Sequence, residues 1–255
     1  GGVLAAIIGP ELLKYTKDLA APIPFMGAII TLALVNVVAL VLVSFIKIPK
    51  AKEEDFKDSG RPLAEIMKQP VFIVAVISGM VGYSVMILIM TASPIAAIAC
   101  VFEVEDAAFL IQWHALAMFA PGFFTGNLIN KFGVLNVIRF GAVLLAICVG
   151  ISLSGLEIEN FWGGLVLLGL GWNFTFVGGT TLLTSCYSPR ERNKVQAAND
   201  FLVFSAAALA SFASGGILQI YGWNMVNITA LPAIFLAFLA VTYLAGKRRE
   251  EAHSV

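Results

Sequence analysis

Long apolar runs dominate this sequence and constrain its fold more than any other feature. One run covers residues 25–46 and contains no charged side chain. Six more runs follow, at about 71–99, 107–129, 137–154, 161–186, 197–220 and 224–246. Several of them exceed the roughly 18 apolar residues that can cross a bilayer as one helix. Because lipid offers the backbone no hydrogen-bond partners, such spans must be helices. We therefore predict an all-α integral membrane protein.

The composition excludes several other classes of protein. Charged residues make up 13% of the 255 residues, whereas a soluble domain carries roughly 25%. The three cysteines lack any CxxC or Cys/His spacing and are expected to be small buried side chains. Two histidines, one of them His253, cannot assemble a zinc site, and the sequence has no phosphate-binding glycine loop. We expect no metal, no cofactor, no nucleic-acid partner and no enzymatic activity.

The runs fall into two groups, which we interpret as parts of two helix bundles. Residues 1–46 hold the first group, in which residues 1–9 are the end of a span stopped by Pro10 and a full span follows. Residues 71–246 hold the second group, of six spans. In its first span, Ser93-Pro94 predicts a kink or an early end of the helix. Six spans set off by a charged segment suggest half of a two-bundle transporter.

That charged segment, residues 47–70, has the composition of a solvated linker, with both signs of charge and several prolines. Within it Leu63, Ile66 and Met67 recur at helical spacing, which predicts a short helix on the membrane surface. A tail of residues 247–255 ends the chain. Ahead of the fifth of the six spans, the stretch Ser188-Pro189-Arg190-Glu191 predicts a capping box that starts a helix in water.

From residue 47 on, connections that carry lysine and arginine alternate with connections that carry neither. The linker carries six of them, the 187–195 connection three, and the 129–139 connection Lys131 and Arg139. The intervening connections 100–106, 155–160 and 221–223 contain none, and the first two carry acidic residues; Lys14 and Lys17 are the exceptions on the outer side. By the positive-inside rule the basic connections and the C-terminal tail are cytoplasmic.

Two ionisable side chains lie inside predicted spans, where such groups are expensive and often functional. His114 could transfer protons or bind substrate, or it could be a neutral imidazole hydrogen-bonded to a neighbouring helix. Asp200 could be a protonatable carboxylate or a gate residue. Its structural alternative is an ion pair with a cation at the same membrane boundary, for which the candidates are Arg139, Arg192 and Lys194.

Polar and aromatic residues interrupt the span at 161–186. They are Trp172, Asn173, Thr175, Thr180, Thr181 and Thr184. An amide, hydroxyls and an indole on shared helix faces suit a cavity that binds a flat polar-aromatic molecule. The same groups could instead form hydrogen bonds between helices, and the sequence does not separate the two readings.

The stretch Gly126-Asn-Leu-Ile-Asn130-Lys131-Phe-Gly133, followed by Arg139, resembles the loop motif G-x-L-a-D-r-x-G-r of the major facilitator superfamily. In that family the motif joins the second and third helices of each six-helix half. Gly9-Pro10 is similar to the glycine-proline signature of the family's fifth helix. The resemblance implies the family fold, with the end of helix five, helix six and the C-terminal six-helix bundle in this chain. The missing N-terminal half of the same protein would be a partner.

Longer phrases, such as RPLAEIMKQPVFIVAV and GLGWNFTFVGGTTLLT, resemble a bacterial subgroup that includes riboflavin-transporter-like proteins. This resemblance implies alternating-access transport of riboflavin or a similar solute across the bacterial plasma membrane. Whether protons are coupled stays open. Family helices seven, eight, ten and eleven would line the cavity, which places these residues near substrate: Tyr83, Trp113, His114, Trp172, Asn173, Phe176 and Thr180.

The resemblance also suggests a gating role for six residues: Gly126, Asn130, Lys131, Gly133, Arg139 and Asp200. Gly126 and Gly133 are expected to form tight turns, and the two cations to hold the motif on the inner side. Asn130 stands where the family has aspartate, so a charged latch is weaker here, or Asp200 supplies the charge.

Efflux of drugs or metabolites is the alternative within the family. A non-transporting receptor or sensor is the alternative from another class.

Overall fold

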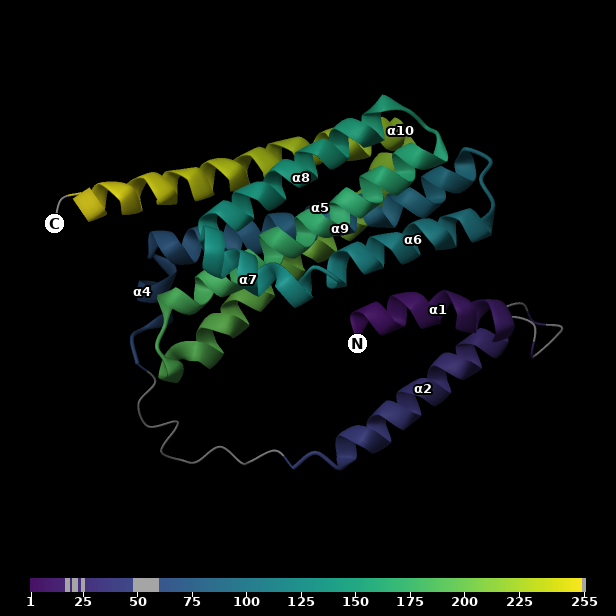
Figure 1. Ribbon diagram of the computed structural model, residues 1–255, viewed down its shortest axis with the longest axis horizontal. Helices are drawn as coiled ribbons and strands as arrows, with labels where there is room; N and C mark the ends of the chain where they lie inside the picture. Colours follow the sequence, from purple (N-terminus) through teal and green to yellow (C-terminus); the bar gives the residue numbers. More distant parts are fainter. Residues whose placement is uncertain (17–18, 20–22, 24–25, 48–59, 254–255) are drawn as a thin grey trace. The chain divides into compact units, whose positions relative to one another are not determined.

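The computed structural model describes residues 1–16, 19, 23, 26–47 and 60–253, and within them the chain forms helices and no strand (Figure 1). The all-α prediction is therefore confirmed. The chain divides into two compact units, Gly1–Asp58 and Ser59–Val255. Half of the predicted linker, residues 48–59, and the last two residues of the predicted tail lie outside the described residues.

The first unit contains α1 (Gly2–Thr16) and α2 (Met26–Ser44). The prediction that Pro10 stops the first helix is wrong, because α1 continues through Pro10 for six more residues. A proline inside a helix removes one backbone hydrogen bond, and membrane helices tolerate this when neighbouring groups compensate. Nearly all side chains of α2 are apolar and exposed, as expected for a helix that presents every face to lipid or to other helices.

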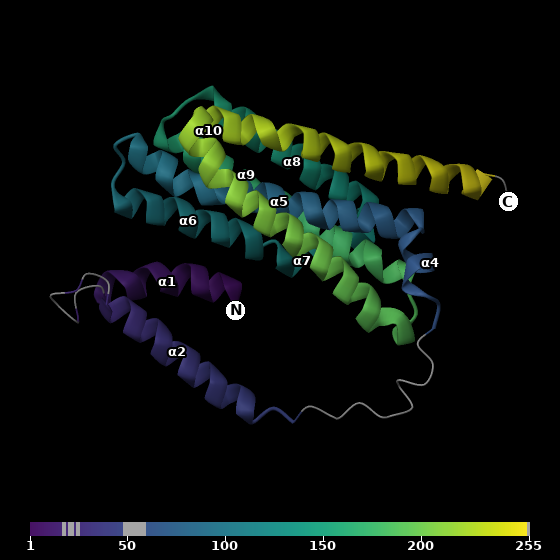
Figure 2. The same cartoon turned by 180° about the vertical axis from the view of Figure 1, so that it is seen from behind.

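The second unit is a bundle of long helices that run beside one another (Figures 1 and 2). Its helices are α4 (Leu63–Met67), α5 (Pro70–Ala99), α6 (Val104–Phe119), α7 (Gly122–Phe132), α8 (Val134–Ser154), α9 (Ile158–Leu183) and α10 (Arg192–His253), with two 3-10 turns, η1 (Thr184–Cys186) and η2 (Pro189–Glu191). Helix α9 packs against α5, α6 and α8, and α10 packs against α5 and α8. The helix predicted around Leu63, Ile66 and Met67 is α4, and its Ile66 is fully buried.

Two of the predicted spans differ from simple straight helices. The run at 107–129 forms the pair α6 and α7, whose axes differ by 43° across the Ala120–Pro121 break. Helix α10 is 62 residues long and reverses direction at Gly222 (Figure 2). Gly222 has φ 81°, a conformation that glycine adopts without steric cost. The two parts of α10 coincide with the predicted spans at 197–220 and 224–246. Of the two outcomes predicted at Ser93-Pro94, a kink or an early end, the early end is wrong, because α5 runs through Pro94 to Ala99.

Helix α9 approaches its neighbours at backbone distance because glycines face them. A Cβ atom added at Gly179 would lie 2.9 Å from the carbonyl oxygen of Ala75 on α5. One added at Gly169 would lie 2.7 Å from the carbonyl oxygen of His114 on α6. Small residues are the usual means of close packing between membrane helices, where no hydrophobic force drives association. The glycines thus make α9 the central helix of the bundle.

The end of the linker is fixed to the turn between α9 and α10 by a set of hydrogen bonds that we call the linker clasp: Arg61, Gln69, Cys186, Ser188 and Glu191. The Arg61 guanidinium donates to Glu191 Oε1 and Oε2, both at 2.9 Å, and to the Cys186 carbonyl at 3.0 Å. Gln69 Nε2 donates to the same carbonyl at 3.2 Å.

Within the linker clasp, the Ser188 backbone N–H donates to Glu191 Oε2 at 2.9 Å, and the capping box predicted for this turn is confirmed. It starts η2, which precedes α10. Hydrogen bonds from Arg61, together with those from Ser188, hold the pKa of the Glu191 carboxyl well below its ordinary value. The Glu191 carboxylate, in turn, raises the pKa of Arg61. The side chain of Glu191 is 3% exposed and that of Arg61 44% exposed, so the carboxylate is the member that depends on its partner.

We expect Arg61→Gln to lower the thermal unfolding midpoint of the detergent-purified protein by a few degrees, because a buried carboxylate loses its cationic partner. Arg192→Gln, which removes an exposed cation nearby, should leave the midpoint unchanged. Tryptophan fluorescence during heating measures both. In a Glu191→Gln background the Arg61 change should cost much less. Equal losses in the two backgrounds would show that the pair does not stabilise the fold.

Candidate functional site

Five aromatic rings from four helices of the second unit contact one another, and we call them the aromatic cluster. They are Tyr83 on α5, Phe119 on α6, Trp172 and Phe176 on α9, and Phe204 on α10. Trp172 and Phe176 are one helical turn apart and stack, with centroids 5.2 Å apart and planes 13° apart. The Tyr83 ring meets Trp172, Phe176 and Phe204 edge-on, at 5.8, 5.3 and 5.3 Å.

The aromatic cluster has a buried base and an open rim. Trp172 is 7% exposed, whereas Phe119 is 42% and Phe204 50% exposed. Edge-to-face and stacked pairs of this kind stabilise by about 0.5–1.5 kcal/mol each beyond the area they bury. The two exposed rings leave aromatic surface uncovered next to the buried Trp172 ring and the Tyr83 ring that they contact. A flat aromatic molecule could therefore extend the ring contacts that already exist.

Two buried hydrogen-bonding groups, one of them in the aromatic cluster, have no partner among the described residues. The indole Nε1–H of Trp172 and the hydroxyl of Ser84, the residue after Tyr83, are buried and have no hydrogen-bond partner among the described residues. Buried polar groups are nearly always paired with protein or water, and an unpaired one costs about 1–3 kcal/mol. The Trp172 N–H is therefore a donor that a water molecule or a bound carbonyl group would satisfy.

The structure brings together three of the residues predicted to bind substrate, namely Tyr83, Trp172 and Phe176. It adds Phe119 and Phe204, which sequence reasoning missed because a phenylalanine in an apolar run has no distinguishing signal. Trp113 lies elsewhere: it is 40% exposed and packs against Phe109 and Trp162, at 6.2 and 5.8 Å. Six residues separate it from Phe119, which places the two rings on different faces of α6.

His114 is fully buried between α6 and α9. Its Nδ1 lies 2.8 Å from the carbonyl oxygen of Leu165. A carbonyl only accepts hydrogen bonds, so Nδ1 carries the proton and donates it. Nε2 is buried without a partner in the described part of the chain. The hydrogen bond to a neighbouring helix, one of the two alternatives from the sequence, is present. A role for the free Nε2 in substrate binding or proton transfer stays a prediction.

Asn173 connects α9 to the bend between α6 and α7. Its Nδ2 donates to the Met118 carbonyl at 2.7 Å, and its Oδ1 accepts from Thr125 Oγ1 at 2.6 Å. The amide orientation follows from these partners, because the carbonyl requires the NH₂ group. All three residues are buried. This geometry supports the reading of Asn173 as a hydrogen-bonding link between helices.

Thr180 is half-buried, and its hydroxyl donates to the Val177 carbonyl of its own helix at 3.0 Å. Such a bond within one turn satisfies the hydroxyl without contacting the aromatic cluster. The predicted substrate-binding roles of Thr180 and Asn173 stay predictions.

The predicted loop motif is mostly helical. Helix α7 includes Gly126, Asn130 and Lys131, and Gly133 alone separates it from α8. The tight turn expected at Gly126 is wrong, because one glycine inside a helix costs only about 1 kcal/mol relative to alanine. The turn at Gly133 is confirmed, with φ 83°.

The charged residues of the predicted gate do not pair with one another. Asn130 and Lys131 are exposed, and the Lys131 ammonium lies 5.3 Å from the Phe132 ring centroid. Arg139 donates to Asn136 Oδ1 at 3.0 Å. Asp200 is exposed and accepts from Asn199 Nδ2 at 3.0 Å, so Arg139 bonds to Asn136 instead of Asp200. A gating role for these residues stays a prediction.

Sequence comparisons show which known proteins this chain is similar to. The profile described as the Major Facilitator Superfamily matches residues 102–255. The riboflavin transporter RfnT of Brucella anthropi is 42% identical over 241 residues, which are 94% of this chain and 61% of that protein. The uncharacterized MFS-type transporter YddS of Bacillus subtilis is 26% identical over 98% of this chain and 61% of its own length. This chain thus spans less than two thirds of these curated relatives. No solved structure matches it.

We expect Thr125→Val to reduce stability by about 1 kcal/mol, since hydrogen bonds between membrane helices average about 0.6 and reach about 1.7 kcal/mol. The substitution keeps the side-chain shape but leaves Asn173 Oδ1 without a donor. Thr125→Ser keeps the hydroxyl and is the matched control. Denaturant unfolding in mixed micelles measures both variants. A valine variant as stable as the serine variant would show that this hydrogen bond does not hold the α6–α7 bend.

Proposed function

The chain belongs to the Major Facilitator Superfamily, and on this premise we propose that the protein containing it transports riboflavin or a similar flat polar-aromatic molecule. Two observations support the substrate class. One is the 42% identity to a riboflavin transporter over nearly the whole of this chain. The other, which carries the proposal, is the aromatic cluster. A family fold alone does not fix the substrate, whereas the chemistry of that cluster restricts the molecules that can bind.

The cluster suits a fused ring system with polar edges. The exposed rings of Phe119 and Phe204 can pack against an aromatic plane, and such contacts are worth about 1–3 kcal/mol per ring in single-stranded nucleic-acid complexes. The Trp172 indole N–H is buried and has no partner in the described chain, and it would donate to a ring carbonyl when substrate binding displaces the side chains that cover it. Riboflavin offers both features, because its isoalloxazine ring is flat and carries two carbonyl groups. A purely apolar aromatic molecule would leave the indole N–H unpaired.

The proposed mechanism is alternating access. The cluster draws its rings from four helices of one bundle, which would form one wall of a site near the bilayer midplane. A second bundle would supply the other wall, and rocking of the two bundles would expose the site to each side in turn. We further propose that the basic connections and the C-terminal tail face the cytoplasm across a bacterial plasma membrane, following the distribution of lysine and arginine.

Riboflavin uptake tests this function. A bacterial riboflavin auxotroph that expresses the protein containing this chain is expected to grow on low external riboflavin and to accumulate labelled riboflavin. The same strain with an empty vector is the control. If the protein neither rescues growth nor raises accumulation while it is present in the membrane, riboflavin uptake is excluded. A fall in accumulation below the control would identify efflux instead.

Within the aromatic cluster, Phe204→Ala is expected to raise the KM for riboflavin up to tenfold, since the loss of one ring contact of about 1.4 kcal/mol corresponds to that factor. Phe212→Ala is the matched control: it lies on the same helix, is 85% exposed, and has no ring contact among the described residues. Initial uptake rates at several concentrations measure both. Equal effects of the two substitutions would remove Phe204 from the proposed site.

A further inference from the structure

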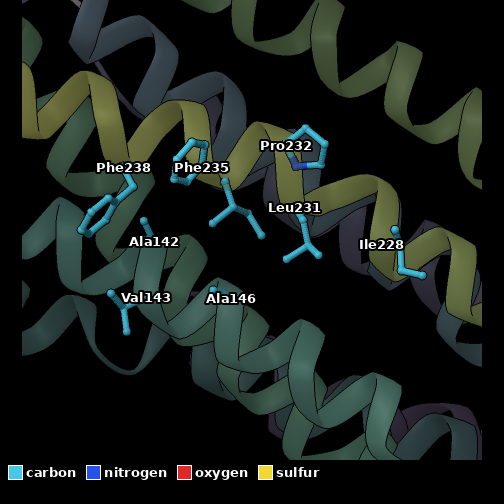
Figure 3. A pocket seen from close by; sticks show the side chains of 9 residues that line it. Ala142, Val143, Ala146, Ile228, Leu231, Pro232, Phe235 and Phe238 are labelled. Atoms are coloured by element: carbon cyan, nitrogen blue, oxygen red, sulfur yellow. The ribbon is translucent and has the colours of Figure 1, made fainter.

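The seam between α8 and the second part of α10 contains a large apolar groove. It has a volume of about 560 Å³, and all its lining side chains are apolar. Figure 3 shows the small side chains Ala142 and Ala146 of α8 across from Leu231, Phe235 and Phe238 of α10. The short alanine side chains leave the groove open on the α8 side, and the larger side chains of α10 form its opposite wall. Because all the side chains that line the groove are apolar, water would not fill it favourably.

A second opening lies further along the same seam, at its basic end. It has a volume of about 240 Å³ and is lined by Gly133 and Asn136 at the start of α8 and by Ala245 and Arg248 of α10. Arg248 is exposed, lies between two further cations in the sequence, and forms no salt bridge with a carboxylate in the part of the chain that the structure describes. The two openings thus place a cationic site and an apolar groove in line.

The spacing between them matches one leaflet of a membrane. Thirteen residues of helix separate Phe235 from Arg248, which corresponds to about 20 Å at about 1.5 Å per residue. Half of a bilayer, including its headgroup layer, is also about 20 Å thick. A molecule with its anionic group at Arg248 and its chain along the seam would therefore reach the membrane centre at the level of Phe235.

We propose that this seam binds one anionic phospholipid, with its phosphate at Arg248 and an acyl chain in the groove beside Ala142 and Ala146. The charge at the end of the seam selects an anionic headgroup. The volume favours an acyl chain over a partner helix. A helix about 10 Å across and 20 Å long fills on the order of 1,600 Å³, about twice the volume of the two openings together. The seam contains no residue of the aromatic cluster, so this inference is independent of the proposed substrate.

The test compares lipids on the detergent-purified, delipidated protein that contains this chain. Phosphatidylglycerol should raise its thermal unfolding midpoint more than phosphatidylcholine with the same acyl chains. Arg248→Gln should abolish most of this difference, whereas Arg192→Gln, which removes an exposed cation outside the seam, should preserve it. Each variant is compared with itself in the two lipids, so a change in its basal stability does not affect the result.

A second variant tests the acyl chain. Ala146→Phe fills the groove and should reduce the stabilisation by phosphatidylglycerol; Ala146→Leu is a smaller filling change for use if the larger side chain prevents folding. Glycerol 3-phosphate, which has the charge without the chains, should not stabilise the protein. Equal stabilisation by the two lipids, equal losses in the two arginine variants, or full stabilisation by glycerol 3-phosphate would each overturn the proposal.

Discussion

The pairing of backbone polar groups in a solvent without hydrogen-bond partners underlies every other feature of this structure. It accounts for helices that run through Pro10 and Pro94, because a broken helix would expose several unpaired groups while a proline removes only one. It also accounts for hydroxyls that turn back onto their own helix, as in Ser93 to the Ile89 carbonyl and Thr175 to the Gly171 carbonyl. In such a solvent each helix is stable on its own, and the packing of the helices then determines the tertiary structure.

Packing in this bundle depends on small residues at the contacts and on a few buried polar links. Glycines bring α9 within backbone distance of α5 and α6, and Asn173 ties α9 to the bend after α6. A few buried polar atoms of the bundle have no hydrogen-bond partner among the residues that the structure describes. The buried Trp172 N–H and the His114 Nε2 have no partner within the described chain. Buried unpaired groups of this kind are rare in folded proteins, and a bound ligand or water molecule would satisfy them.

The charged residues at the helix ends have two different roles: some report the membrane topology, and others cap helices. Glu103 and Glu157 lie in the connections without lysine or arginine, and each is the N-cap of a capping box, for α6 and α9 respectively. A carboxylate at a helix N-terminus is stabilised by the helix dipole and by the free N–H groups. These acids therefore have a structural reason to be there, whereas the lysines and arginines alone carry the topological signal. At the opposite end of the bundle, Glu191 combines a capping role with the ion pair that holds the linker.

Sequence patterns were enough to predict the helical class, the spans from residue 25 onward, the capping box at Ser188 and the family. Each of these depends on hydropathy, on a local hydrogen bond or on a short motif. The packing of four helices was needed to bring Tyr83, Phe119, Trp172 and Phe204 into one cluster, because these residues are far apart in the chain. The tertiary structure also separated Trp113 from that cluster and showed that Gly126 lies inside a helix. Facing directions and helix breaks depend on neighbours that no local pattern specifies.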